Sequence, residues 1–131
     1  MNPLYLESSA LLRLVLNQDD AAEVARRISE ASHVLASRLV RVEAERALLR
    51  IALDHPDRRR ELPALRLRLA EVCSQMEFLE MTREVCDAAG RIAPESRLRS
   101  LDAIHLATFE TLRQLEPSAE ILTYDERLRA L

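Results

Sequence analysis

The fold is decided by the stretch Leu98-Arg-Ser-Leu-Asp-Ala-Ile-His-Leu-Ala-Thr108. Through and beyond it, apolar side chains recur at helical spacing, at Leu101, Ile104, Leu112 and Leu115. Ser100 is expected to cap this helix, which puts Asp102 in the first turn, where a carboxylate favours the positive helix end. We therefore expect a buried helix that begins near Ser100 with an acid at its start, and a capping role is the simplest one for Asp102 taken alone.

Short apolar runs alternate with helical patterns along the rest of the chain. Four of these runs predict strands: Leu4–Leu6, His33–Ser37, Glu77–Met81 and Glu120–Tyr124. Ser8 or Ser9 is expected to cap the helix that follows the first strand. No strong hairpin signal joins the strands, so the succession predicts an α/β fold with a parallel sheet and helices on both faces. Right-handed crossovers then bring the carboxyl ends of all strands to one side, where open α/β sheets bind ligands.

Four acids fall at this predicted edge of the sheet. Glu7 ends the first strand, Asp125 ends the last, and Glu43 and Asp102 lie near the starts of two helices. Carboxylates at one rim repel one another and raise some of their pKa values unless a cation neutralises them. Oxygen ligands without histidine or thiolate suit Mg²⁺ or Mn²⁺, which acidify water and hold phosphodiesters. For Glu43, a surface ion pair with Arg46 is the alternative.

The composition bounds the class of protein. A chain of 131 residues is expected to form one domain, residues 1–131. The net charge of −3 is not the basic balance of most nucleic-acid binders. No apolar run approaches the roughly 20 residues of a membrane span, and the first residues lack the pattern of a signal peptide. We expect a cytoplasmic protein without membrane contact.

Missing residue types exclude several chemistries. All 19 basic residues are arginine, so a P-loop or a Schiff-base enzyme, each of which needs a lysine, is excluded. Gly90 is the single glycine, which removes glycine-rich dinucleotide loops. The chain has no Gly-x-Ser-x-Gly motif of a serine hydrolase. An Asp-based phosphatase also fails, because both Asp-x-Asp and lysine are missing.

Four blocks of the chain resemble the motifs of a known family. They are Leu6-Glu-Ser-Ser-Ala-Leu11, Leu39-Val-Arg-Val-Glu43, Leu101-Asp-Ala-Ile-His-Leu-Ala107 and Leu122-Thr-Tyr-Asp-Glu-Arg-Leu128. In this order they resemble the four motif blocks of PIN domains, specifically the VapC-type toxins of bacterial toxin–antitoxin pairs. The resemblance implies a three-layer fold with a central parallel sheet of four or five strands flanked by helices. It also implies a Mg²⁺- or Mn²⁺-dependent endoribonuclease, usually a homodimer, that is silenced by a cognate antitoxin.

The same resemblance implies roles for individual residues. The metal-binding and catalytic acids are Glu7, Glu43, Asp102 and Asp125, with Ser9 and Thr123 in support. Water activated by the metal then attacks an RNA phosphate. The family most often has aspartate where this chain has Glu7. Because Mg²⁺ demands near-ideal distances of about 2.0 to 2.1 Å and the longer side chain shifts the carboxylate, we expect Mn²⁺ to support activity at least as well as Mg²⁺.

Alternatives stay open at the edges of this hypothesis. Arg46, Arg97 and Arg99 are placed to contact RNA phosphate, but ordinary salt bridges explain them too. His105, three residues after Asp102, is either a nitrogen ligand or proton shuttle, or a packed side chain held by a hydrogen bond, and the second is favoured. The rival function is a PIN-like binding or regulatory module that cleaves weakly or not at all, which the unusual Glu7 keeps open.

Overall fold

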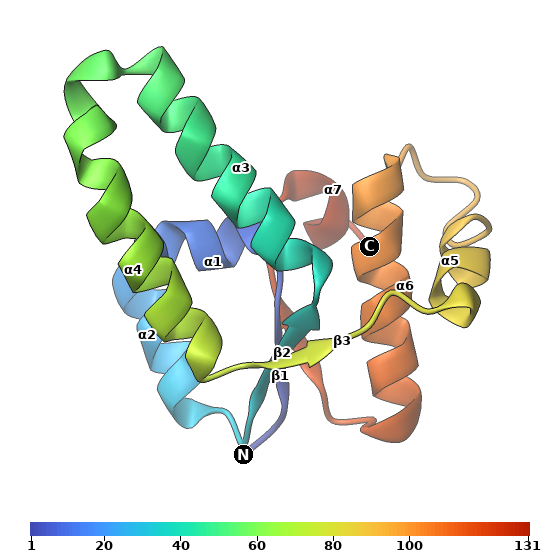
Figure 1. Ribbon diagram of the computed structural model, residues 1–131. Coiled ribbons are helices and arrows are strands. Elements are labelled where there is room, and N and C mark those ends of the chain that lie inside the picture. Colours follow the sequence, from blue (N-terminus) through green and yellow to red (C-terminus); the bar gives the residue numbers. More distant parts are fainter.

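Strands and helices alternate along the chain, and the computed structural model describes all residues, 1–131 (Figure 1). The elements are β1 (Leu4–Leu6), α1 (Ser8–Val15), α2 (Ala21–Glu30), β2 (Val34–Ser37), α3 (Leu39–Asp54), the 3-10 helix η1 (Pro56–Glu61), α4 (Leu62–Ser74), β3 (Glu77–Leu79), α5 (Arg83–Ala89), α6 (Ser100–Leu115), β4 (Glu120–Leu122) and α7 (Glu126–Arg129). The four predicted strands are all present, and each is shorter than or as long as the apolar run that predicted it.

The sheet is parallel throughout, with strand order β3-β2-β1-β4. Tyr5 in the central strand β1 pairs with Leu35 of β2 and Ile121 of β4. Since all strands run the same way, their carboxyl ends share one edge of the sheet. The predicted α/β fold with a central parallel sheet flanked by helices is confirmed, and the sheet has four strands.

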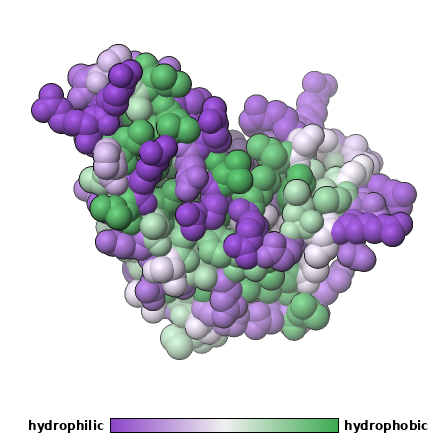
Figure 2. Space-filling model, in the orientation of Figure 1, coloured by the Kyte–Doolittle hydropathy of each residue, from purple (hydrophilic) through white to green (hydrophobic).

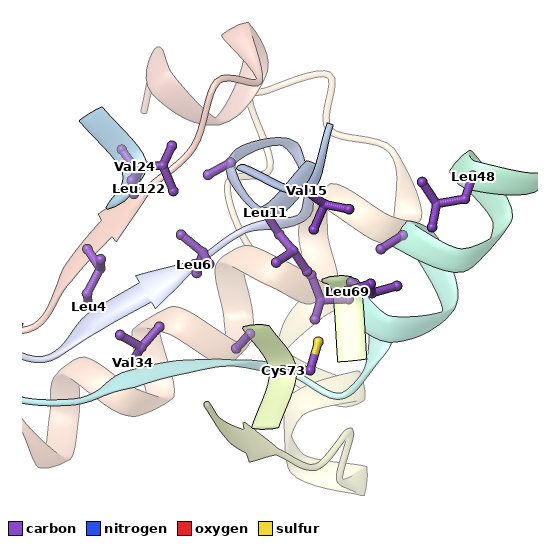
Figure 3. Packing of buried hydrophobic residues seen from close by; sticks show 14 residues of the cluster. Leu4, Leu6, Leu11, Val15, Val24, Val34, Leu48, Leu69, Cys73 and Leu122 are labelled. Carbon is purple, nitrogen blue, oxygen red and sulfur yellow. The ribbon is translucent and has the colours of Figure 1, made fainter. Parts of the chain in front are cut away.

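Alternation along β1 divides the core into two layers. Leu4 and Leu6 pack on one face with residues of α1 to α4, such as Leu11 and Leu69 (Figure 3). Tyr5 points to the opposite face, where it packs with Phe109 of α6. Figure 1 shows the same division, with α1 to α4 on one side of the sheet and α5 and α6 on the other. Because both faces are covered, β1 and β2 are buried at every position, and the two glutamates of the sheet, Glu77 and Glu120, stand at the exposed starts of the edge strands β3 and β4.

Helix α6 is rotated relative to the sequence prediction. Leu112 is buried as expected, but Leu101 is 45% exposed and Leu115 is 80% exposed. Besides Leu112, the buried face carries two alanines, three polar side chains and one aromatic ring, namely Ala103, Ala107, Asp102, His105, Thr108 and Phe109. The apolar period alone could not show this, because the helix has leucines on both sides of that face. The expected cap at Ser100 is also wrong, since Arg99 is the N-cap and Asp102 accepts its N–H at 3.3 Å.

Helices α3 and α4 form an arm with η1 at its outer end, and this arm extends past the sheet (Figure 1). The sequence of η1, Pro-Asp-Arg-Arg-Arg-Glu, contributes no buried residue. Figure 2 shows hydrophilic side chains over much of this outer end, with apolar side chains among them. No helix in the structure has both the length and the apolar character that crossing a bilayer requires.

Candidate active site

One pocket at the carboxyl edge of the sheet is lined by all four predicted acids, Glu7, Glu43, Asp102 and Asp125. They come from the end of β1, from α3, from the first turn of α6 and from the residue before α7. The pocket, called the acidic pocket below, is completed by Ser8, Ser9, Leu12, Arg99, Ser100 and Leu101. The structure therefore brings together carboxylates that lie in four separate parts of the chain.

Glu7 is held by four hydrogen bonds. Its Oε2 accepts from Ser8 Oγ at 2.5 Å and from the Ser9 backbone N–H at 3.1 Å, and its Oε1 accepts from Ser9 Oγ at 2.5 Å and Thr123 Oγ1 at 2.6 Å. Glu7 is thus the N-cap of α1. The prediction that Ser8 or Ser9 caps this helix is wrong, because the longer glutamate side chain folds back onto the first turn.

The hydrogen bonds to Glu7 also keep it ionised. Burial by itself raises the pKa of Glu7, which is only 5% exposed. The hydroxyls of Ser8, Ser9 and Thr123 stabilise the charged form and outweigh burial, so the net pKa lies below its ordinary value. A buried carboxylate at neutral pH is tolerable here because both of its oxygens are satisfied.

Ser9 and Thr123 connect the two strand ends that flank the acidic pocket. Besides donating to Glu7, Ser9 Oγ accepts the backbone N–H of Tyr124 at 2.8 Å. Thr123 Oγ1 accepts the backbone N–H of Asp125 at 3.0 Å. Each hydroxyl therefore links the β1–α1 junction to the β4–α7 junction. This arrangement is what a supporting role for the two residues requires.

Asp102 and Asp125 each use one carboxylate oxygen at the start of a helix. Asp102 Oδ2 accepts the Arg99 N–H at 3.3 Å, and Asp125 Oδ1 accepts the Arg127 N–H at 2.8 Å as the N-cap of α7. The second oxygen of each, Asp102 Oδ1 and Asp125 Oδ2, accepts no hydrogen bond. Both acids thus combine a capping contact with an oxygen that accepts no hydrogen bond, although the Arg127 guanidinium lies 4.0 Å from Asp125 Oδ2.

Glu43 pairs with a histidine. Its Oε1 lies 2.5 Å from His105 Nε2, so the alternative of an ion pair with Arg46 is wrong. On the other side of the ring, His105 Nδ1 lies 2.8 Å from the Tyr5 hydroxyl. The favoured interpretation of His105 as a packed residue held by a hydrogen bond is confirmed. Burial, the largest cause, raises the pKa of Tyr5, which therefore keeps its phenol proton.

Sequence reasoning missed the parts that Tyr5 and Ser8 play. A tyrosine in a fully buried strand is a usable signal, because its hydroxyl must find a partner inside the protein. The pattern did not show which residue that partner is, since His105 lies 100 residues away. Ser8 was considered only as a helix cap, yet its hydroxyl donates to Glu7.

Only one of the three arginines considered for RNA contact reaches the site. Arg99 lines the acidic pocket, and its side chain is 71% exposed. Arg46 and Arg97 are exposed, hold no ion pair and do not line this pocket. The structure thus leaves Arg99 as the cation at the mouth of the acidic pocket.

The ligands in the acidic pocket suit a hard divalent cation in type but are not gathered as a finished metal site. Glu43 Oε2, Asp102 Oδ1 and Asp125 Oδ2 accept no hydrogen bond, and carboxylate oxygens are what Mg²⁺ and Mn²⁺ prefer. However, no three His, Cys, Asp or Glu side chains are close enough together to hold a metal ion. Binding one requires these side chains to move, and Glu7 would have to release a hydrogen bond.

A parallel sheet between helical layers, with carboxylates from four elements at its carboxyl edge, is the arrangement that the resemblance to PIN domains implied. The PIN domain family matches residues 4–131, and the chain belongs to this family. It is 34% identical to ribonuclease VapC46 of Mycobacterium tuberculosis, over 98% of this chain and 89% of that protein. It is 31% identical to ribonuclease VapC35 of the same species, over 96% of this chain and 87% of that protein.

Solved structures share the fold. VapC20 of Mycobacterium tuberculosis, described as a sarcin-ricin loop cleaving toxin, superposes with a TM-score of 0.69 at 14% identity, covering 97% of this chain and 93% of that one. A toxin–antitoxin complex from Klebsiella pneumoniae gives a TM-score of 0.66 at 16% identity, covering 93% of this chain and 86% of that one. Identities this low support the fold, and the resemblance to VapC proteins rests on the closer sequence relatives.

Proposed function

We propose that this protein is an endoribonuclease that hydrolyses RNA phosphodiester bonds with Mg²⁺ or Mn²⁺ and serves as the toxin of a toxin–antitoxin pair. The observation that carries the proposal is the acidic pocket, which is lined by four carboxylates from separate elements of a PIN fold. RNA as the substrate is supported by the relatives named ribonuclease VapC, which match nearly the whole chain.

Three residues are best placed to hold the cation. Glu43, Asp102 and Asp125 each present a carboxylate oxygen without a hydrogen bond. Glu7 joins them only if one of its hydroxyl donors turns away, so its main contribution is a fixed negative charge beside them. When bound, the cation supplies the acidification of water and the neutralisation of charge on the phosphate.

The chain itself supplies the contact to RNA. The Arg99 guanidinium at the mouth of the acidic pocket can bind a phosphate with two parallel hydrogen bonds. An acidic pocket repels RNA, so such a contact and the cation together compensate for the net charge of −3. Specificity then depends on how single-stranded bases fit around the pocket.

We also propose a cognate antitoxin and a homodimer as the partners, in the cytoplasm. An antitoxin is supported by the solved neighbours that were determined as toxin–antitoxin complexes. The arm adds support, because it presents Val42, Leu53 and Leu67 to solvent with exposed fractions of 58%, 69% and 67%. Exposed apolar side chains of this size are typical of surfaces that bind another protein.

The saturated state of Glu7 favours the second candidate function, a PIN-like binding or regulatory module with weak or no cleavage. A carboxylate that already accepts four hydrogen bonds has no lone pair left for a cation. The two candidate functions differ in cation-dependent RNA cleavage, because only a nuclease has a cleavage activity that is lost when the cation is removed.

The deciding experiment is an RNA cleavage assay with Mn²⁺ or Mg²⁺ and with EDTA, on the wild type, Asp102→Asn and Asp125→Asn. Asparagine keeps the capping oxygen that each helix start needs but removes the charge, so the fold is retained. We expect EDTA to abolish cleavage and each variant to lower it about 100-fold or more. Asp87→Asn, at an exposed position of α5, is the matched control. Cleavage that is indifferent to EDTA and Asp102 contradicts the proposal, and no cleavage at all supports the binding module.

A further inference from the structure

A chain of hydrogen bonds runs through the protein interior to one carboxylate of the acidic pocket. It starts at the Ser37 backbone N–H, 3.3 Å from the Tyr5 hydroxyl, passes to His105 Nδ1 over 2.8 Å, and ends at Glu43 Oε1, 2.5 Å from His105 Nε2. Tyr5 is 0% exposed and His105 is 1% exposed. Tyr5 belongs to β1 and His105 to α6, which are far apart in the sequence. Of the members of this buried hydrogen-bond chain, only Glu43 belongs to the set of cation-holding residues described above.

We propose that Tyr5 and His105 are positioning residues for Glu43: the Tyr5 hydroxyl orients the His105 ring, and the His105 Nε2–H holds one oxygen of Glu43 and leaves the other for the cation. This inference rests on the proposed function, because it assigns the buried hydrogen-bond chain a purpose in the acidic pocket. It adds two residues that do not touch substrate or cation.

The direction of the buried hydrogen-bond chain follows from counting protons. Ser37 N–H can only donate, so the Tyr5 oxygen accepts from it. The single phenol proton then needs an acceptor, and His105 Nδ1 is in hydrogen-bond geometry at 2.8 Å. The nearby Thr108 hydroxyl is engaged elsewhere, because it donates to the Ile104 carbonyl at 2.6 Å. A ring that accepts at Nδ1 carries its proton on Nε2, which is the atom facing Glu43. Every donor in the chain therefore points towards the carboxylate.

The packing around Tyr5 makes the chain a rigid support. Tyr5 lies in the central strand, and its ring packs against Phe109 with centroids 5.8 Å apart and edge-on to His105 at 6.1 Å. Glu43, by contrast, lies on a helix with its side chain 18% exposed and has several rotatable bonds. A hydrogen bond from the buried His105 ring to one Glu43 oxygen removes much of the rotational freedom of this side chain before a cation binds. Hydrogen bonds of this kind, made by residues that do not touch the metal, raise the affinity of the residues that do.

Three variants separate positioning from mere packing. Tyr5→Phe keeps the ring and removes only the hydroxyl. His105→Gln keeps an acceptor for Tyr5 and an N–H donor for Glu43, whereas His105→Leu keeps neither. His55→Gln makes the same exchange at an exposed position at the end of α3 and is the matched control. Thermal unfolding of each variant confirms that it is folded.

The first measurement uses the metal-free protein. Long-range ¹H–¹⁵N spectra, assigned by the signals lost in His105→Gln, are expected to show His105 protonated at Nε2 and unprotonated at Nδ1. Three-bond couplings of the Glu43 side chain are expected to report one rotamer in the wild type and an average of several in Tyr5→Phe and His105→Leu. A proton on Nδ1, or a Glu43 rotamer that none of the variants changes, overturns the proposal.

The second measurement titrates Mn²⁺ alone and follows free Mn²⁺ by electron paramagnetic resonance. We expect affinity to fall about 10- to 100-fold in His105→Leu, and about 2- to 10-fold in Tyr5→Phe, with most of the loss recovered in His105→Gln. Equal affinities in His105→Gln and His105→Leu overturn the proposal, since packing alone would then explain the histidine. If the wild type neither binds Mn²⁺ nor cleaves RNA, the proposed function fails, and the metal-free spectra still decide whether Tyr5 and His105 position Glu43.

Discussion

Thr123 Oγ1 donates a 2.6 Å hydrogen bond to Glu7 Oε1 across 116 residues of chain. The two residues follow neighbouring parallel strands, β4 and β1. One hydroxyl therefore joins the capping acid of α1 to the loop that carries Asp125, whose N–H it also accepts at 3.0 Å. This contact therefore ties together the two chain segments that carry Glu7 and Asp125.

Thr123→Val tests the contribution of this hydroxyl. Valine has nearly the same shape, so the change leaves Glu7 short of one donor and the Asp125 N–H without its acceptor. We expect the free energy of unfolding to fall by about 1–3 kcal/mol in urea titrations. Thr123→Ser, which keeps the hydroxyl, is expected to recover most of this loss. Thr111→Val, at an exposed position of α6, is the control and is expected to change stability by less than about 0.5 kcal/mol.

Glu7→Gln tests the saturated carboxylate in the metal-free protein. The amide has one acceptor oxygen instead of two and brings an NH₂ group towards Ser8 and Ser9, which already donate there. We expect a loss of about 1–3 kcal/mol in the free energy of unfolding at pH 7, measured by urea titration. Glu95→Gln, at an exposed loop position, is the control. Equal stability of Glu7→Gln and wild type contradicts the interpretation.

The pH dependence of that difference has a defined sign. The folded protein lowers the pKa of Glu7 below its ordinary value of 4.5. The stability gained from the ionised carboxylate is therefore complete above pH 4.5 and is lost as pH falls through the lower pKa of the folded state. We expect the difference between wild type and Glu7→Gln to be constant from pH 7 to about pH 5.5 and to shrink below about pH 4.5. A difference that grows on acidification contradicts this assignment.

The order of strands and helices and the four acids of the acidic pocket were predictable from sequence, because both depend on residues that are near one another in the chain. Apolar runs that alternate with helical periods gave the four strands, and acids at the ends of those runs had to share the edge where parallel strands end. Glu7 and Asp125 follow their strands directly or within a few residues, so no knowledge of distant contacts was needed to place them.

Tertiary contacts decided the rest. Leu101 and Leu115 have the helical spacing of a buried face, yet α6 turns His105 inward, because Tyr5 and Glu43 satisfy both of its nitrogens. The local pattern could not choose between Glu43 pairing with Arg46 three residues away and with a histidine 62 residues away. In the same way, the cap of α1 was assigned to a serine, although the longer Glu7 side chain reaches the same N–H.

Glu7 also leads to a prediction about metal preference. Its carboxylate is fixed by four hydrogen bonds and is carried on a longer side chain than aspartate, whereas Mg²⁺ requires near-ideal octahedral geometry. We expect the wild type to cleave RNA with Mn²⁺ at least as fast as with Mg²⁺, and Glu7→Asp to shift the ratio of initial rates towards Mg²⁺. A wild-type enzyme that works with Mg²⁺ alone contradicts this expectation.

Arg99→Ala tests the proposed contact between the mouth of the acidic pocket and RNA. The Arg99 side chain is 71% exposed and lies 3.9 Å from Asp102 Oδ2, so its removal perturbs the fold little. We expect KM for RNA to rise about 5- to 20-fold, as for the loss of one charged phosphate contact, with kcat within about twofold of wild type. Because the contact is electrostatic, the salt dependence of KM should also become shallower. The control is Arg97→Ala, which removes an exposed arginine two residues away that does not line the pocket. We expect this control to leave KM unchanged. An equal effect of both variants would mean that the overall charge attracts the RNA, and not a defined contact with Arg99.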